Sequence, residues 1–130
     1  MIVVDASALL EALIGTPSAP LVEAYIFQED QTVHVPHLLD LEVTQVLRRL
    51  VLGGGITVAR AQQALGHLAN LQPLRYPHEF LLPRVWELRS NVTAYDAVYI
   101  ALAEHLGAPL LTRDRRMATA AGHHAQIELV

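Results

Sequence analysis

The chain has 130 residues, 52% of them apolar, and it carries a net charge of −4 and no cysteine. This length predicts one domain, residues 1–130, that can bury a core without disulfides or a structural metal. The acidic balance argues against a simple nucleic-acid-binding module, which is usually basic, but it leaves open an enzyme that acts on nucleic acid.

The first half of the chain alternates short apolar runs with helical patterns. Its expected elements, in chain order, are a strand at 1–4, helices at 7–14 and 21–27, a strand at 32–35, and helices at 38–52 and 57–71. Pro36 stops the second strand, and the glycines at 53–55 separate the last two helices. No Gly-Lys-Ser/Thr follows those glycines, so they do not form a phosphate-binding loop.

The second half continues the alternation. Its expected elements are a strand at 74–76, helices at 80–89 and 93–106, a strand at 109–112, a helix at 115–121 and a strand at 125–130. Thr93 is suited to cap the longest of these helices and Gly107 to end it. Strands that alternate with helices indicate an α/β fold with a mostly parallel central sheet.

The chain shows no signal for export or membrane insertion. Its start, Met-Ile-Val-Val-Asp, has no basic segment and places an acid within the apolar run. No run of about 18 apolar residues is present. With the absence of cysteine, these features predict a cytoplasmic protein. The high apolar fraction predicts that another chain covers part of the surface, and hence a homodimer.

Four carboxylates lie where a carboxylate is unfavourable. Asp5 ends the first apolar run, Asp114 follows the apolar run at 109–111, and Glu42 and Asp96 fall within apolar helices. Carboxylates are rarely buried without a partner, and the chain has no lysine. Since ligands of parallel sheets bind at the carboxyl ends of the strands, these acids are expected to converge at one edge of the sheet.

Two acids of the helix at 38–52, Asp40 and Glu42, are expected on different faces of that helix. At about 100° per residue, Glu42 lies inside the apolar arc that begins at Leu38, whereas Asp40 lies outside it. Asp40 is therefore expected in solvent, and Glu42 at the edge of the core.

A shared divalent metal is the partner that this set of acids predicts. Mg²⁺ and Mn²⁺ prefer oxygen ligands in near-octahedral geometry, which carboxylates and waters supply. One such metal can turn a bound water into a nucleophile, and a second can stabilise the leaving oxygen of a phosphodiester. The candidate catalytic and metal-binding residues are Asp5, Glu42, Asp96 and Asp114.

Each acid also has a purely structural interpretation. Asp5 or Ser7 could cap the first helix, Asp96 follows Thr93 by three residues as in a capping box, and Asp114 could be an ordinary loop acid. The combination is nevertheless more specific than any one member.

Histidines and aromatic residues carry less information. The seven histidines accompany neither cysteine nor a His-Glu-x-x-His motif, so a zinc site is not expected. Trp86 and the tyrosines are expected in the core, except for Tyr95, which neighbours Asp96. Arginines border the acids, and they are candidates for substrate contacts: Arg113, Arg115 and Arg116.

Four segments together resemble the PIN-domain nucleases. They are Val-Val-Asp-Ala-Ser-Ala-Leu-Leu at 3–10, Asp-Leu-Glu-Val at 40–43, the segment from Asn91 to Glu104, and Leu-Leu-Thr-Arg-Asp at 110–114. The resemblance covers nearly the whole chain and keeps the family's order and spacing. Size and composition are similar to the stand-alone VapC-type toxins of bacterial toxin–antitoxin pairs, although relatives often carry lysine, which is absent here.

This resemblance implies a three-layer α/β/α sandwich and a Mg²⁺- or Mn²⁺-dependent endoribonuclease. Asp5 and Asp96 would be the most direct metal ligands, and Ser7 and Thr112 would be hydroxyls that support them. The resemblance also implies an RNA substrate, a homodimer and a small cognate antitoxin as inhibitor.

Three alternatives are weighed against this interpretation. A phosphoacceptor receiver domain needs a lysine and a central acceptor aspartate, but the chain has no lysine and residues 43–78 hold no aspartate. A two-aspartate phosphatase needs Asp-x-Asp, whereas Ala6 and Ser7 follow Asp5. A PIN fold that only binds RNA, or a nuclease that is not a toxin, remains the closer alternative, although the presence of all four acids disfavours pure binding.

Overall fold

The computed structural model describes all of residues 1–130 and contains one five-stranded sheet. The strands are β1 (Ile2–Val4), β2 (Val33–Pro36), β3 (Leu74–Tyr76), β4 (Leu110–Thr112) and β5 (Ile127–Leu129). Their order is β3-β2-β1-β4-β5, and every neighbouring pair is parallel. This arrangement confirms the predicted α/β class, with a sheet that is wholly parallel.

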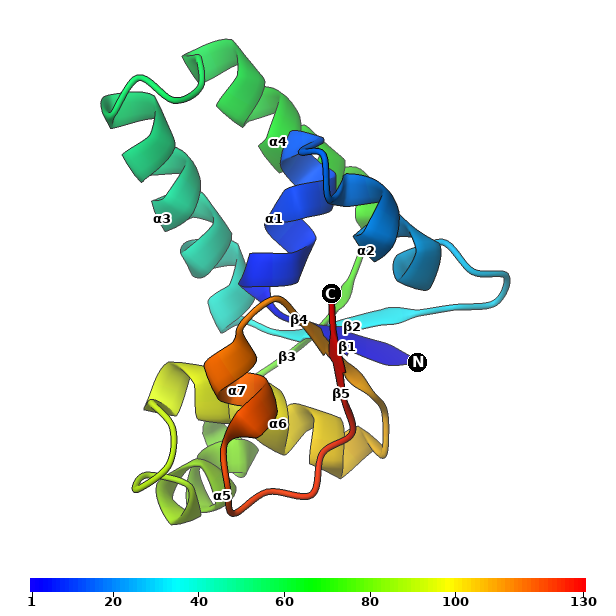
Figure 1. The fold of residues 1–130 in the computed structure, drawn as a ribbon, viewed down its shortest axis with the longest axis vertical. Coiled ribbons are helices and arrows are strands. Elements are labelled where there is room, and N and C mark those ends of the chain that lie inside the picture. Colours follow the sequence, from blue (N-terminus) through cyan, green and yellow to red (C-terminus); the bar gives the residue numbers. More distant parts are fainter.

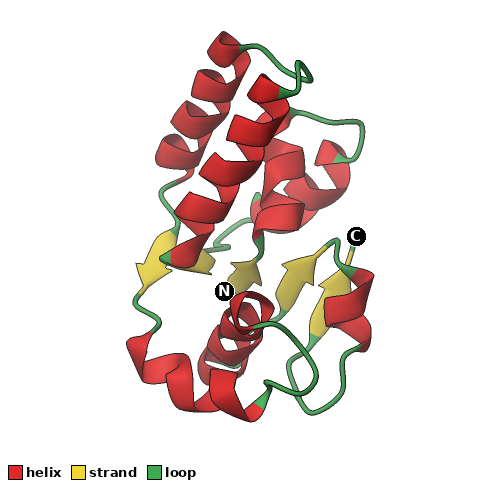
Figure 2. Ribbon diagram, turned by 90° about the vertical axis from the view of Figure 1, so that its left-hand side faces the viewer, coloured by secondary structure: helices red, strands yellow, loops and turns green.

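Helices cover both faces of the sheet. They are α1 (Ala6–Ile14), α2 (Ala19–Ile26), α3 (Leu38–Leu52), α4 (Val58–Leu71), α5 (Leu82–Glu87), α6 (Ala94–Leu106) and α7 (Arg115–Thr119). Figure 1 shows α1 to α4 above the sheet and α5 to α7 below it, and Figure 2 shows the same two helical layers from the side. The predicted three-layer sandwich is therefore present.

Several helices differ at their boundaries from the expected ones, and proline explains two of these differences. The second helix begins at Ala19 rather than residue 21, because Pro20 lies in its first turn, where the missing N–H is not needed. The helix expected at 80–89 is a 3₁₀ turn, Glu79–Leu81, followed by α5, which begins just before Pro83. Proline fits only the first turn of a helix, so one continuous helix through this segment is disfavoured.

The core consists of one cluster of 32 buried apolar residues. Strands β1, β2 and β4 are buried throughout, and α6 is buried continuously from Ala97 to Ala103 because it packs beneath β1 and β2. The expectation for Trp86 was wrong: this side chain is 68% exposed, and its ring packs under the guanidinium of Arg89. None of the helices combines the length and the apolar composition that crossing a membrane requires.

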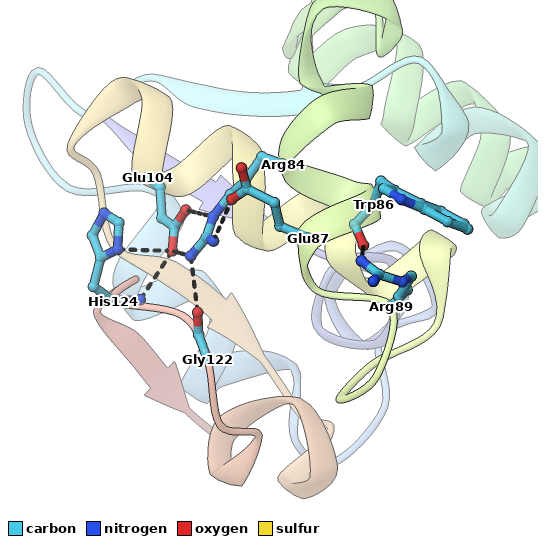
Figure 3. Close-up of polar contacts among 7 residues, drawn as sticks. All are labelled: Arg84, Trp86, Glu87, Arg89, Glu104, Gly122 and His124. Carbon is cyan, nitrogen blue, oxygen red and sulfur yellow. Dashed lines mark hydrogen bonds and ion pairs between the residues drawn. The ribbon is translucent and has the colours of Figure 1, made fainter.

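A polar clasp holds the C-terminal segment against α5 and α6 (Figure 3). Arg84 donates two hydrogen bonds to the carboxylate of Glu104, at 2.7 Å and 3.0 Å, and a third to the carbonyl of Gly122 at 3.0 Å. The backbone N–H of His124 donates to the same carboxylate at 2.9 Å. The clasp therefore joins three segments that are distant in sequence.

Candidate active site

The first turns of α1 and α3, above the sheet, and of α6 and α7, below it, lie at the same edge of the sheet, on the left in Figure 1. This is the edge where β1, β2 and β4 end, and short connections lead from those strands into α1, α3 and α7. Each of the four helices carries one of the predicted acids at or near its N-terminus, where the helix dipole favours negative charge.

Asp5 is the most constrained of these acids. It is only 4% exposed, and it caps α1 by accepting a hydrogen bond from the N–H of Ala8 at 2.9 Å. The hydroxyl of Ser7 donates to Oδ1 of Asp5 at 2.7 Å, and that of Thr112 donates to Oδ2 at 2.7 Å. Both carboxylate oxygens are thus held in a fixed direction by neighbouring strands and α1.

The same two hydroxyls also position the loop after β4. The N–H of Arg113 donates to Ser7 Oγ at 3.0 Å, and the N–H of Asp114 donates to Thr112 Oγ1 at 2.9 Å. The carboxylate of Asp114 then caps α7 by accepting from the N–H of Arg116 at 2.8 Å. A continuous network of hydrogen bonds therefore links Asp114 to Asp5.

Glu42 lies in the second turn of α3 and is half-buried, whereas Asp40 on the other face forms a surface ion pair with Arg75 at 2.7 Å. The hydroxyl of Tyr99, from α6, donates to Oε1 of Glu42 at 2.6 Å. Tyr99 is 1% exposed, so its hydroxyl is fixed by packing. Sequence reasoning placed Tyr99 in the core but missed this contact; its position one turn after Asp96 was the available signal.

Asp96 lies in the first turn of α6 and is half-buried. Its N–H donates to the hydroxyl of Thr93, which caps the helix, at 3.2 Å. The backbone of Asp96 therefore has a structural role, while its carboxylate lies close enough to Asp114 and Asp5 to be repelled by both.

Electrostatic repulsion joins the four acids into one group, which we name the acidic cluster: Asp5, Glu42, Asp96 and Asp114. Burial is the largest effect and raises the pKa of Asp5, Glu42 and Asp96. Repulsion from other members raises the same three pKa values further, and hydrogen bonds oppose it, as from Thr112 to Asp5 and from Tyr99 to Glu42. No member forms an ion pair with an arginine or histidine.

The acidic cluster has the donor chemistry of a hard divalent cation site, because it offers only carboxylate oxygens around an uncompensated negative charge. As the side chains stand, no group of three or more acidic, histidine or cysteine residues is arranged to hold a metal ion. The residues fit such a cation in chemical type and in location at the edge of the sheet.

The three predicted substrate-contact arginines differ in their availability. Arg113 lies 3.6 Å from the carboxylate of Glu11, with which it forms an ion pair. Arg115 and Arg116 are exposed at the start of α7, directly after Asp114, and their guanidinium groups have no partner. These two cations border the acidic cluster without neutralising it.

Comparison with known proteins identifies the class. The PIN domain family matches residues 2–123, so the chain belongs to the PIN-domain family. Ribonuclease VapC1 of Mycobacterium tuberculosis is 46% identical over 129 residues, covering 98% of this chain and 96% of that protein. Within the PIN family the chain is thus one of the VapC ribonucleases, the RNA-cleaving toxins of toxin–antitoxin systems.

Solved structures agree on the fold. PAE2754 from Pyrobaculum aerophilum superposes with a TM-score of 0.71 at 26% identity, over 97% of this chain and 81% of that one. VapBC2 from Rickettsia felis, in a crystal structure bound to a DNA fragment from its promoter, superposes with a TM-score of 0.74 at 12% identity. The superposition covers 100% of this chain and 99% of that one. At that identity the second likeness concerns the fold alone.

We expect Tyr99→Phe to lower kcat about tenfold while leaving KM for RNA unchanged, the size typical of losing a group that orients a metal ligand. The substitution removes only the hydroxyl that holds Glu42. Steady-state kinetics, with Mn²⁺ binding followed by calorimetry, would measure the effect. Tyr25→Phe is the matched control, because the Tyr25 hydroxyl makes no hydrogen bond. Unchanged kcat and unchanged metal affinity would contradict a positioning role for Tyr99.

Proposed function

We propose that residues 1–130 act as a single nuclease domain that cuts RNA internally, using Mg²⁺ or Mn²⁺ held by the acidic cluster. One observation carries this proposal. Four carboxylates from four separate segments lie near the carboxyl edge of a parallel sheet, close enough to repel one another, and none of them forms an ion pair with a basic side chain. Membership of the VapC ribonucleases supports RNA as the substrate.

The protein's own residues would divide the work at this site. Asp5 and Asp96 would be the most direct ligands, with Glu42 and Asp114 completing the set. Ser7 and Thr112 hold the two oxygens of Asp5 in place, which reduces the reorganisation that ligation requires. The bound cation would supply an activated water and stabilise charge on the phosphate.

The arginines would contact the RNA backbone. Arg115 and Arg116 have free guanidinium groups, whose planar fork suits phosphate oxygens. Arg113 would have to exchange its ion pair with Glu11 for a phosphate. We therefore rank Arg115 and Arg116 above Arg113 as substrate contacts.

The metal requirement gives the direct test. We expect purified protein to cleave RNA with Mg²⁺ or Mn²⁺, and to lose cleavage in EDTA and regain it when either metal is restored. Ca²⁺ binds in a looser geometry and should support little turnover. Gel assays with an unstructured RNA would follow the reaction. Cleavage that persists in EDTA would rule out the mechanism.

Two partners follow from the exposed apolar side chains: a second copy of the chain and a small antitoxin. Leu52 is 71% exposed and Phe27 is 66% exposed, in a protein we place in the cytoplasm. The solved relatives include VapBC complexes, in which toxin and antitoxin are bound together. Light scattering across micromolar concentrations should report a dimer, and a monomer would contradict that part of the proposal.

A growth assay separates a regulated toxin from a nuclease that is not a toxin. Expression of the chain alone should arrest bacterial growth, and co-expression of the small protein encoded next to it should restore growth. Asp5→Asn should be harmless and still bind that protein in a pull-down, because apolar surface supplies most of the contact. Harmless wild-type protein, at confirmed expression in the native host lacking the partner, would reject the toxin role.

A further inference from the structure

An open pocket lies beside the acidic cluster, between α1, α3 and the start of α6. Its volume is about 380 Å³, within the range of roughly 300–1,000 Å³ that small-ligand sites occupy. Ser7 and Glu42 form part of its wall, so it is continuous with the candidate active site. The pocket therefore adjoins the place where an RNA phosphate would reach the acidic cluster.

The walls of the pocket combine an aromatic ring, apolar surface and free polar groups. Tyr95 borders it with a side chain that is 64% exposed, and Leu41 and Val46 add apolar surface. Gln45 and Arg49 also line it, and neither side chain forms a hydrogen bond or an ion pair within the protein. The exposed ring offers a face for stacking, and the amide and guanidinium offer donors.

Arg49 is one of four arginines, among the nine of the chain, whose guanidinium has no partner within the protein. Five guanidinium groups are engaged by carboxylates, carbonyls or an aromatic ring: Arg60, Arg75, Arg84, Arg89 and Arg113. The free ones are Arg48, Arg49, Arg115 and Arg116. Arg49 lines the pocket, and Arg115 and Arg116 follow Asp114, so three free cations border the acids from two sides.

We propose that this pocket binds an unpaired nucleobase of the RNA, next to the phosphodiester that is cut. Tyr95 stacks on the base, Gln45 hydrogen-bonds to its edge, and Arg49 contacts the adjoining phosphate. Proteins commonly recognise single-stranded RNA through such stacking and edge contacts. An apolar side chain of a protein partner would instead leave Gln45 and Arg49 unpaired, which disfavours it as the occupant. The inference rests on the proposed function, and it adds which part of the site gives the nuclease its preference for an RNA sequence.

The test uses full-length protein and a random-sequence pool of single-stranded RNA. Sequencing of the products made with Mn²⁺ gives the base preference at each position around the cut. Gln45→Ala should change that preference at one position only. Tyr95→Ala should raise KM roughly tenfold to a hundredfold, as expected when one stacked base is lost, and Tyr95→Phe should keep the wild-type KM.

Arg49→Ala has a matched control in Arg48→Ala, which removes the same charge from the neighbouring position of α3, outside the pocket. RNA affinity, measured by fluorescence anisotropy in EDTA, should fall more for Arg49→Ala than for Arg48→Ala. The fall should be similar for all sequences, because a phosphate contact carries no base information. Equal losses for the two variants would remove Arg49 from the proposal.

The pocket proposal and the proposed function fail in different ways. If wild-type protein cuts RNA but Gln45→Ala and Tyr95→Ala keep the wild-type base preference and KM, the pocket does not bind a base. If these variants lose the antitoxin in a pull-down and cut RNA normally, the pocket seats the protein partner. If wild-type protein cuts no RNA, the proposed function is wrong, and anisotropy with Tyr95→Ala still decides whether RNA occupies the pocket. Gln45 is exposed, so Gln45→Ala should stay folded. If Tyr95→Ala unfolds, Gln45→Ala still tests whether the pocket binds a base.

Discussion

Asp96→Asn is expected to reduce RNA cleavage by more than about 100-fold, the upper end for losing a group that only orients a metal ligand. The substitution keeps the size of the side chain and leaves the backbone bond from Asp96 to Thr93 intact. It removes one negative oxygen donor from the acidic cluster. Single-turnover cleavage with saturating Mn²⁺ would measure the loss, and near-normal cleavage would show that Asp96 is not a ligand.

The same variant should unfold at a higher temperature than wild type when no metal is bound. Burial and repulsion from Asp114 and Asp5 raise the pKa of Asp96 in the folded state. The folded protein therefore binds more protons than the unfolded chain, so this group contributes stability that is full below the unfolded pKa and lost as pH rises through the folded pKa. Asn carries no charge and avoids that loss.

Thermal unfolding in EDTA at a series of pH values would test the sign. The gain in stability of Asp96→Asn over wild type should be largest near neutral pH and should shrink as pH falls toward the ordinary aspartate pKa of about 3.9. Asp40→Asn serves as the control, because it breaks a surface ion pair with Arg75 and relieves no repulsion. A less stable Asp96→Asn at neutral pH would mean that the carboxylate acts chiefly as a cap of α6.

The sequence predicted the elements that local patterns determine. The strand and helix order, the parallel sheet and the half-buried face of Glu42 all follow from hydrophobic periodicity and from Gly and Pro positions. Asp5, Asp96 and Asp114 were predicted as site residues from local signals. Asp5 and Asp114 follow strands, and Asp96 follows the cap residue Thr93. Parallel topology brings the carboxyl ends of strands to one edge, which places Asp5 and Asp114 there, whereas Asp96 lies on a helix that follows α5 rather than a strand.

Contacts between distant residues were not predicted, because periodicity assigns a face but not a partner. The hydroxyl of Tyr99 reaches Glu42 across 57 positions of sequence, and Thr112 reaches Asp5 across 107. Trp86 was wrongly placed in the core, since its size alone suggested burial, whereas the short α5 exposes that face. The Arg84 clasp was also unforeseen, because Glu104 gave no sign in the sequence that it is buried.

The largest effect on stability is expected from that clasp. Only 6% of the Glu104 side chain is exposed, and burial by itself would raise its pKa. Hydrogen bonds from Arg84 and the His124 amide, together with their nearby charges, lower the pKa of Glu104 overall. Hydrogen bonds to Glu104 and Glu87 raise the pKa of Arg84, so Arg84 and Glu104 remain ionised in the folded state.

Arg84→Met should therefore lower the free energy of unfolding by about 3–5 kcal/mol at neutral pH, because it leaves a buried carboxylate without its cation. For a domain of this size that corresponds to a fall in Tm of roughly 10–20 °C. Arg89→Met is the control: it removes an exposed arginine of the same region that packs on Trp86, and should cost less than about 1 kcal/mol.

The double variant Arg84→Met/Glu104→Leu should recover most of the lost stability, since replacing both charges with apolar groups of similar volume removes the unpaired carboxylate. The dependence of stability on pH offers a second check of the Arg84–Glu104 pair. The stabilising contribution of Glu104 is present above its unfolded pKa and is lost as pH falls through its lower folded pKa, so wild type and Arg84→Met should converge in stability at acid pH. A double variant as unstable as Arg84→Met would show that Arg84 acts through its bond to the Gly122 carbonyl rather than through Glu104.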